Sequence, residues 1–311
     1  MTNTVTICMR EYPMTFQEFI TRFSTEEKCR EYLFGLRFPK GFVCPKCGHD
    51  KYWAVGETLF TCAGCRHQMS VIAGTIFQDT RKPLINWFTA IWWVTTQKNG
   101  ASAQGLQQVL GLKSYETAWV WLHKIRTAMV NPNRRKLSGV VEIDETLIGG
   151  VSAGKRGRGA ENKALVIIAT ELDEKKVGRC RMGIIADASS DSIHPFIKDN
   201  VEKGSILITD GWNGYNGIEK EGYTREIHVQ KHADDEEKLL PHIHTIASLL
   251  KRWLLGTHQG RVEKKHLQAY LDEYVFRFNR RKSAKRGLLF YRLLESAAQT
   301  KATTLDEISD R

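Results

Sequence analysis

The sequence has no apolar run long enough to cross a membrane. Its longest strongly apolar segment is the short WFTAIWWV around Trp92, whereas a membrane-spanning helix needs about 20 apolar residues. The N-terminal stretch MTNTVTICMREYPMTF also lacks a basic region followed by an uninterrupted apolar run, which is the pattern of a secretory signal. We therefore expect a cytoplasmic protein with no membrane partner.

Acidic residues are too few to balance the basic ones. The 311 residues include 46 Lys and Arg but 35 Asp and Glu, which gives a formal net charge of +11. This excess favours a polyanionic partner such as a nucleic acid. The length exceeds the ~100–200 residues usual for one domain, so we expect two or three domains.

Two pairs of cysteines have the spacing of a metal site. They lie in the segments CPKCGHD and CAGCRHQ and comprise Cys44, Cys47, Cys62 and Cys65. Each CxxC turn directs two thiolates towards one ion, and two such turns complete a four-thiolate Zn²⁺ site. We predict a zinc ribbon with structural zinc over residues 41–76. Two unrelated turns or a redox dithiol are the alternatives, and His49 and His67 are adjacent donors.

Helical patterns flank the ribbon. TFQEFITRF and EKCREYLFGLRF space apolar residues three and four apart, so we predict helices within residues 1–40. ASAQGLQQVLGLKSYETAWVWLHKIRTAM contains two helices, a turn at Gly111 and a capping residue at Ser114. This layout is typical of a helix-turn-helix DNA-binding region, assigned to residues 77–135, and a plain helical hairpin is the alternative. The segment NPNRRKLSG is interpreted as a linker.

The pattern changes to strands after Ser138. VVEIDETLIGG and VGRCRMGIIAD alternate, KALVIIATEL is an apolar run, and ILITDGWNGY gives a fourth strand after the helical DSIHPFIKDNV. Three strands, a helix, a fourth strand and further helices are the order of a ribonuclease-H-like α/β domain with a mixed sheet. We assign this catalytic domain to residues 136–295 and expect a charged tail over residues 296–311 to fray.

Two aspartates are expected to meet at one end of this sheet. Asp144 lies on the first strand and Asp210 at the end of the fourth, which is the neighbour of the first in such a sheet. Carboxylates brought together repel, and a divalent cation such as Mg²⁺ or Mn²⁺ usually lies between them. Two such ions can activate an attacking hydroxyl and stabilise the leaving oxygen of a phosphodiester. A third ligand from a later helix completes the arrangement. The segment HIHTIASLLKRW lies in the region where this ligand is expected.

Neighbouring residues have simpler interpretations. Glu142 shares the side of the strand with Asp144 and is expected to pair with an Arg or Lys, whereas Glu145 should face the other way. Asp187 ends a strand and is expected to be a turn residue. Trp212 and Tyr215 are expected to pack under the site, and stacking on a DNA base is the alternative.

Taken in order, these blocks resemble the bacterial insertion-sequence transposases of the DDE type that carry an N-terminal zinc ribbon. The resemblance covers nearly the whole chain and rests on CPKCG with CAGC, AGTIF, LGLKSYETAWVWLHKIR, VEIDETLIGG, ITDGWNGY, LKRWLLGTHQG and HLQAYLDEYVFRFNRR. It implies a nucleoid-associated DNA transposase that binds terminal inverted repeats and catalyses metal-dependent strand cleavage and strand transfer. Its partners are then the double-stranded DNA of the transposon ends and target, bound by a homodimer or larger assembly.

The third catalytic residue departs from the usual acid. The family usually places it, often as glutamate, seven positions before the lysine of an LKR segment, and here these positions are His244 and Lys251. The resemblance therefore implies Asp144, Asp210 and His244 as ligands of Mg²⁺ or Mn²⁺, with Lys251 positioning phosphate. Because imidazole suits transition ions better than Mg²⁺, we expect Mn²⁺ to support activity disproportionately.

Helix geometry separates the two histidines of this segment. At about 100° per residue, His244 and Lys251 share a flank of the helix, whereas His242 points some 200° away from His244 and keeps a structural interpretation. The apolar face comprises Ile243, Ile246, Ala247, Leu250 and Leu254. Glu236 and Glu237 are the alternative third ligands, in a run otherwise typical of a solvated loop.

Two basic segments are predicted to contact DNA. The loop GGVSAGKRGRGAEN resembles a P-loop but lacks its Ser or Thr, so nucleotide binding is rejected and a DNA-backbone contact is preferred. Its basic residues are Lys155, Arg156 and Arg158, and those of the second segment are Arg277, Arg280 and Arg281. A solvated basic face is the alternative for the second segment.

Two rival functions remain open for the whole chain. One is a transposase-derived DNA-binding regulator with an inactive catalytic domain, and the other is a nuclease that cleaves without joining.

Overall fold

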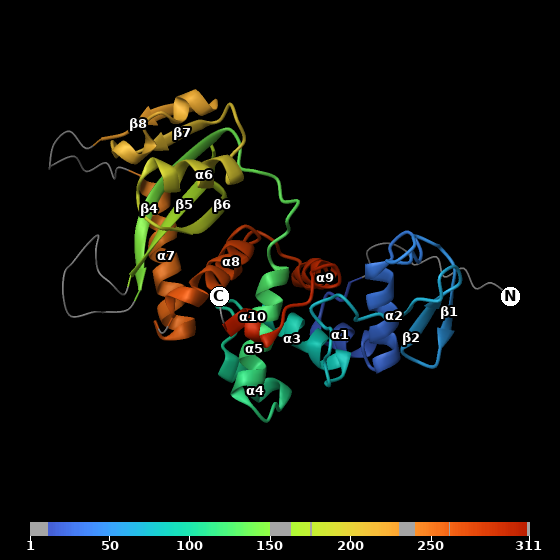
Figure 1. Cartoon of the computed structure of the whole chain (residues 1–311). Coiled ribbons are helices and arrows are strands. Elements are labelled where there is room, and N and C mark those ends of the chain that lie inside the picture. Colours follow the sequence, from blue (N-terminus) through green and yellow to red (C-terminus); the bar gives the residue numbers. More distant parts are fainter. Residues whose placement is uncertain (1–11, 150–162, 175, 230–239, 261, 310–311) are drawn as a thin grey trace. The chain divides into compact units, whose positions relative to one another are not determined.

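The chain is organised as two compact units. The computed structural model in Figure 1 describes residues 12–149, 163–174, 176–229, 240–260 and 262–309. The first unit consists of Met1–Asn131 and Ser283–Asp310, and the second of Pro132–Lys282. The chain therefore leaves the first unit, builds the second, and returns to the first.

The first unit combines helices with a small three-stranded sheet. Its elements are α1 (Phe16–Arg22), α2 (Glu26–Arg37), β1 (Tyr52–Val55), β2 (Leu59–Cys62), β3 (Gln68–Ser70), α3 (Leu84–Thr96), α4 (Ala103–Leu110), α5 (Tyr115–Ala128), α9 (Arg286–Ala297) and α10 (Leu305–Ser309). Thr15 and Thr25 begin the first two helices, because their hydroxyl oxygens accept hydrogen bonds from the N–H groups of Glu18 and Lys28. The helices predicted within residues 1–40 are confirmed.

α3 is apolar on most of its surface because it lies in the core of this unit. Phe290 of α9 packs against the rings of Phe19, Phe23, Phe88 and Trp92, with centroids 5.4–6.2 Å apart. Aromatic pairs at such distances add to the free energy of apolar burial. The segment WFTAIWWV is thus a core helix. Among the helices in the described residues, none is long and apolar enough to cross a membrane.

The C-terminal residues differ from the prediction. We expected the catalytic domain to continue to residue 295 and a fraying tail to follow, but α9 belongs to the first unit. Gly287 lies so close to the N-terminal segment that a Cβ there would be 1.6 Å from the Pro13 carbonyl oxygen. Ile308 of α10 is 2% exposed. Ala297 and Ala298 are buried as well, and α10 contacts α5, so the residues after 295 are packed within the first unit.

α4 and α5 form the two-helix arrangement predicted from the sequence. Gly111 ends α4 in the left-handed conformation with φ of 59°, and Ser114 begins α5 by accepting a hydrogen bond from the Glu116 N–H group. The exposed residues of α5 are Tyr115 and Glu116 in its first turn, and the rest of the helix is buried or half-buried. Reading of a DNA groove by α5 stays a prediction, and burial restricts such a contact to this end of the helix.

The second unit contains a five-stranded mixed sheet. Its elements are β4 (Val140–Gly149), β5 (Lys163–Asp173), β6 (Lys176–Ile185), α6 (Ser190–Asn200), β7 (Ile206–Thr209), η1 (Asn213–Tyr215), η2 (Ile218–Glu221), β8 (Thr224–Ile227), α7 (Pro241–His258), η3 (Lys264–His266) and α8 (Leu267–Phe278). The strand order is β6-β5-β4-β7-β8; β4, β5 and β6 pair antiparallel, while β7 is parallel to β4 and β8. The ribonuclease-H-like fold is confirmed, and β8 is an additional strand that was not predicted.

Helices cover both faces of this sheet (Figure 1). Val141 and Ile143 of β4 belong to a core with α6, whereas Ile148 belongs to a core with α7 and α8. Alternate residues of a strand face opposite sides. Glu142 and Asp144 therefore lie on the face covered by α7 and α8, as the sequence predicts.

Replacing Phe290 with alanine should strongly destabilise the first unit, because this fully buried side chain packs among aromatic rings of α1 and α3. Such core truncations cost about 3–5 kcal/mol. Thermal denaturation followed by near-UV circular dichroism is the measurement. Leu305→Ala is the control, since Leu305 is 42% exposed, and equal losses in the two variants would contradict the packing.

Candidate active site

Neighbouring parallel strands carry the two predicted catalytic aspartates. Glu142 of β4 is in register with Ile208 of β7, and Asp144 and Asp210 each lie two residues further along. β7 ends at Thr209, so Asp210 is the first residue beyond the strand. Adjacent strands lie about 4.8 Å apart. Both aspartates are half-buried, and the sheet holds them at corresponding positions where β7 ends.

His244 of α7 lies beside Asp144. Its Nε2 atom is 3.9 Å from Asp144 Oδ2, and the two side chains are 58% and 22% exposed. Two carboxylates with one imidazole form a donor set that suits Mn²⁺ better than Mg²⁺. Within the described residues, however, the four cysteines are the only set of three or more His, Cys, Asp or Glu ligand atoms that all lie within 4.8 Å of one another. The ligand atoms of the predicted catalytic residues are therefore more widely spaced than the four cysteine Sγ atoms.

A buried carboxylate holds the start of α7 against β4. Glu142 is 3% exposed; its Oε1 lies 2.6 Å from His242 Nδ1, and its Oε2 accepts a hydrogen bond from the Ile243 N–H group at 3.1 Å. Leu240 at the N-cap supplies no side-chain hydrogen bond. Glu142 therefore satisfies a free N–H group at the positive end of the helix dipole. We expected an Arg or Lys partner for Glu142, and this expectation was wrong.

This contact sets the position of His244. Asp144 follows Glu142 by two residues on the same face of β4, and His244 follows His242 by two residues in the first turn of α7. The structure also confirms the predicted apolar face of α7, comprising Ile243, Ile246, Ala247, Leu250 and Leu254. Lys251 is exposed on the same helix. His242 has the structural role that was predicted, with a partner that was not.

Arg225 of β8, which was not among the predicted site residues, organises the loop that carries Asp210. Its guanidinium donates to Thr209 Oγ1 at 2.9 Å, to the carbonyl oxygens of Asp210 and Trp212 at 3.0 and 3.1 Å, and to Asn216 Oδ1 at 2.7 Å. Asp210 Oδ1 in turn accepts from the Trp212 N–H group at 2.9 Å. A lone arginine in an unpredicted four-residue strand has no spacing signal that could have identified it.

Tyr215 lies beneath the aspartates on the α6 face. It is fully buried and donates its hydroxyl hydrogen to Glu145 Oε1, so Glu145 faces away from Asp144 as predicted. Burial raises the pKa of Tyr215 well above its usual value, and the negative charges of Glu145, Asp144 and Asp210 raise this pKa further. Tyr215 is thus a packed, neutral support, which confirms the packing interpretation.

The turn after Asp210 packs closely against the loop between β6 and α6. The Trp212 Nε1–H group donates to the Ala188 carbonyl oxygen at 2.6 Å. A Cβ at Gly214 would lie 2.2 Å from that same oxygen, so this position requires glycine. Asp187 accepts hydrogen bonds from the Ser189 hydroxyl and N–H groups and from the Ser192 hydroxyl, which lower its pKa. Asp187 is therefore a turn residue, as predicted.

The four cysteines of the ribbon converge as predicted. The Sγ atoms of Cys44 and Cys65 are 3.7 Å apart, and those of Cys47 and Cys62 are 3.6 Å apart. Tetrahedral Zn²⁺ with Zn–S bonds of about 2.3 Å requires sulfur–sulfur distances of about 3.8 Å. The thiolates therefore fit a structural zinc ion, and neither adjacent histidine is needed.

The predicted DNA-contacting arginines of α8 and the following turn have partners within the second unit. Arg277 forms an ion pair with Glu273 at 2.9 Å, and Glu273 is 1% exposed. Arg280 lies over the Phe276 ring at 4.0 Å. Arg281 donates to the carbonyl oxygens of Val177 and Gly178. These contacts stabilise the unit, and DNA contact by the same arginines stays a prediction.

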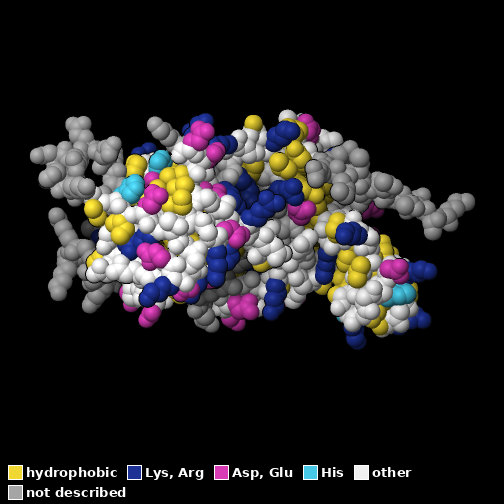
Figure 2. Space-filling view, turned by 90° about the horizontal axis from the view of Figure 1, so that it is seen from above, with side chains coloured by type: hydrophobic (Ala, Val, Ile, Leu, Met, Phe, Trp, Pro, Cys, Tyr) yellow, Lys and Arg dark blue, Asp and Glu magenta, His cyan; other side chains and the backbone are white. Residues whose placement is uncertain are grey.

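Other predicted residues lie outside the described part of the chain. They are Lys155, Arg156 and Arg158 of the basic loop, and Glu236 and Glu237, the alternative third ligands. Figure 2 shows Lys and Arg side chains (dark blue) gathered on part of the surface, whereas acidic side chains (magenta) are scattered.

The fold and the cysteine cluster define a two-part protein with a zinc ribbon and a ribonuclease-H-like domain. Family models match both parts: the ISXO2-like transposase domain matches residues 136–279, and the transposase zinc-ribbon domain matches residues 24–68. The chain belongs to the insertion-sequence transposases of the DDE type with an N-terminal zinc ribbon. A relative from Halobacterium salinarum, an uncharacterized protein in transposable element ISH50, is 28% identical over 283 residues, covering 83% of this chain and 92% of the relative.

Solved structures with distant similarity include an integrase and a transposase. The catalytic core domain of BIV integrase is 15% identical with a TM-score of 0.32, covering 47% of this chain and 87% of that one. The Mos1 transposase paired-end complex is 11% identical with a TM-score of 0.28, covering 68% and 75%. The Mos1 strand transfer complex is 12% identical with a TM-score of 0.28, covering 70% and 79%.

Cys62→Ser should abolish zinc binding and unfold the ribbon, because a weaker ligand replaces one of four thiolates and metal binding supplies the folding free energy of small zinc domains. Metal content per chain after dialysis is the measurement, with about one zinc expected in the wild type. Cys180→Ala, in the second unit, is the control and should keep its zinc. Full zinc content in Cys62→Ser would contradict the four-thiolate site.

Glu142→Ala should destabilise the second unit by about 1–3 kcal/mol, because a buried N–H group loses its acceptor. Glu142→Gln should lose less, since its amide oxygen still accepts this hydrogen bond. Urea denaturation is the measurement, and Glu226→Ala, at an exposed position of β8, is the control. Equal stability of Glu142→Ala and the control would show that α7 does not depend on this contact.

Proposed function

We propose that the chain is an active DNA transposase that cuts the ends of its element and joins them to target DNA. The juxtaposition of Asp144, Asp210 and His244 is the observation that carries the proposal. His244 lies 3.9 Å from Asp144, and Asp210 follows the strand paired with β4. Acidic side chains fixed at neighbouring strand positions, next to an exposed imidazole, suit cation-assisted phosphoryl transfer rather than a purely structural role.

Two phosphoryl-transfer steps make up the proposed reaction. In the first, a water oxygen attacks a phosphorus at the transposon end, and the P–O3′ bond breaks to leave a 3′-hydroxyl. In the second, this hydroxyl attacks a target phosphodiester in line, forming a new P–O3′ bond and releasing a target 3′-hydroxyl. Bound Mg²⁺ or Mn²⁺ supplies activation of the nucleophile and stabilisation of the leaving oxygen. No covalent bond to the protein forms.

Each group of residues has a distinct task in this proposal. Asp144, Asp210 and His244 hold the cations, and Lys251 on the exposed flank of α7 contacts a substrate phosphate as a point charge. Arg225 and Tyr215 position the Asp210 loop. The ribbon and the exposed end of α5 bind the terminal repeats. Because two ends must be joined together, the acting species is at least a homodimer on double-stranded DNA.

Strand transfer of labelled terminal-repeat DNA with Mg²⁺ or Mn²⁺ tests the proposal. Asp144→Asn and Asp210→Asn should fall below about one-hundredth of the wild-type rate, as expected when electrostatic stabilisation of the transition state is lost. Asp191→Asn, at an exposed position of α6, should retain full activity. Products that are cut but never joined would indicate a nuclease instead. DNA binding without either product in the wild type would indicate the regulator with an inactive catalytic domain.

His244→Glu tests the unusual third residue directly. A carboxylate at this position should keep activity and shift the ratio of Mg²⁺-supported to Mn²⁺-supported rates towards Mg²⁺, because hard oxygen ligands suit Mg²⁺. Rates measured with each metal give the ratio. Thr245→Glu adds the same charge at the next exposed position of α7 and should leave the ratio unchanged. An unchanged ratio in His244→Glu would remove His244 from the metal site.

A further inference from the structure

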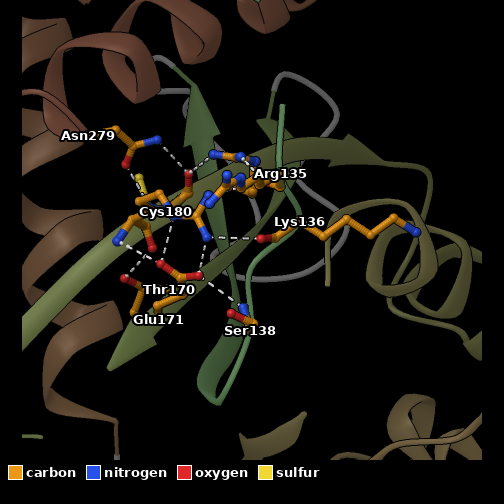
Figure 3. Close-up of polar contacts among 9 residues, drawn as sticks. Arg135, Lys136, Ser138, Thr170, Glu171, Cys180 and Asn279 are labelled. Atoms are coloured by element: carbon orange, nitrogen blue, oxygen red, sulfur yellow. Dashed lines mark hydrogen bonds and ion pairs between the residues drawn. The ribbon is translucent and has the colours of Figure 1, made fainter. Parts of the chain in front are cut away.

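The segment that enters the second unit is fixed to the sheet by two arginines. Arg179 donates to the carbonyl oxygens of Arg135 at 3.2 Å and Lys136 at 2.9 Å, and Arg181 donates to the Arg135 carbonyl oxygen at 2.8 Å. Figure 3 shows these contacts, with Lys136 extending away from the network. Two adjacent carbonyls are thus directed at the sheet, and their backbone is held in place.

The next residues are fixed as firmly. Leu137 is fully buried; its N–H group donates to the Asn200 carbonyl oxygen at 2.8 Å, and its own carbonyl oxygen accepts from the Glu202 N–H group at 2.7 Å. The Ser138 N–H group donates to Glu171 at 2.9 Å. The interpretation of this region as a simple linker was therefore incomplete, because residues 134–138 are built into the second unit.

Three consecutive basic side chains are displayed by this fixed backbone. Arg134, Arg135 and Lys136, termed the basic strap, are all exposed. Their side-chain partners are neutral: Arg134 donates to Asn200 Oδ1 at 3.3 Å, and Lys136 Nζ donates to the Lys198 carbonyl oxygen. Within the described residues, no carboxylate forms an ion pair with the strap.

The nearest acidic side chain of the network, Glu171, is engaged by arginines of β6. Glu171 is paired with Arg179 and its negative charge also acts on Arg181, whereas the three strap residues form no ion pair with an acidic side chain among the described residues. Burial, together with the positive charges of Arg134 and Arg179, lowers the pKa of Arg181 to about 10, although nearby Glu171 acts in the opposite direction. Like charges held together in this way raise the free energy of the folded protein, and an anion bound here would relieve the repulsion.

We propose that the basic strap is a binding site for the phosphodiester backbone of double-stranded DNA. The assignment rests on the proposed function, which supplies DNA as the polyanion. Guanidinium groups suit phosphate because they offer paired N–H donors. Because Arg179 and Arg181 already hold the strap backbone, less conformational entropy is lost on binding than with a flexible basic segment. The strap contributes affinity that does not depend on base sequence, because its target is phosphate.

The salt dependence of DNA binding tests the site. The variant Arg134→Ala/Arg135→Ala/Lys136→Ala should bind a labelled terminal-repeat duplex more weakly. Its plot of log affinity against log salt should be less steep by about 2 to 3, since each phosphate contact contributes about 0.9 to the slope. Fluorescence anisotropy over a series of NaCl concentrations measures both quantities. Lys203→Ala/Lys220→Ala/Lys264→Ala removes the same charge at exposed positions of the same unit and should change the slope by less than about 1.

Arg179→Lys tests whether the fixed backbone of the strap adds to DNA affinity beyond the charge of its side chains. This variant keeps its charge but loses the fork that holds the carbonyls of Arg135 and Lys136. It should weaken binding while leaving the slope nearly unchanged. Binding as tight as wild type in Arg179→Lys would show that the fixed backbone contributes nothing.

Two further outcomes decide the inference. Equal slopes in the strap variant and the lysine control would overturn the strap as a site, even if wild-type protein binds and joins DNA. Failure of the wild type itself to bind DNA would instead overturn the proposed function. A melting curve verifies folding, and if the triple variant does not fold, Arg135→Gln replaces it, with an expected slope change of about 0.9.

Discussion

The buried carboxylate of Glu142 is the contact on which the candidate active site depends. An unpaired buried charge costs several kcal/mol, but here the two carboxylate oxygens face an imidazole and the N–H group of a helix terminus. β4 is the central strand of the sheet, with β5 and β7 as neighbours. Glu142 therefore couples α7 to the central strand of the sheet, and His244 and Asp144 each follow that contact by two residues.

The Asp210 side of the site is built differently. β7 has four residues, too few to fix the residue beyond its end by strand pairing alone. Arg225 holds the carbonyls of the turn, and Tyr215 fills the space below it. One half of the site thus depends on a helix held by a buried charge, and the other on a turn held by an arginine.

The zinc ribbon depends on metal for a simple reason of size. All four residues of β1 are exposed, and the ribbon core comprises Phe42, Cys44, Cys62 and Met69. So small an apolar core cannot offset the conformational entropy lost on folding. Thiolate–metal bonds supply the missing free energy, which explains why two of the ligands lie within the core itself.

The sequence by itself determined the elements that depend on local patterning and on short spacing. It gave correct positions for four of the five sheet strands, the apolar face of α7, the opposite facing of Asp144 and Glu145, and the convergence of the four cysteines. Burial on one face imposes a period on nearby residues, and a CxxC turn brings its own thiolates together, so both signals are local.

Only the tertiary structure decided which surfaces meet. Glu142 and His242 are 100 residues apart in the sequence, α9 returns to the first unit, and the carbonyls of residues 135 and 136 face two arginines of β6. Periodicity shows that a side chain will be covered, but the partner that covers it is set by the register of strands and helices distant along the chain.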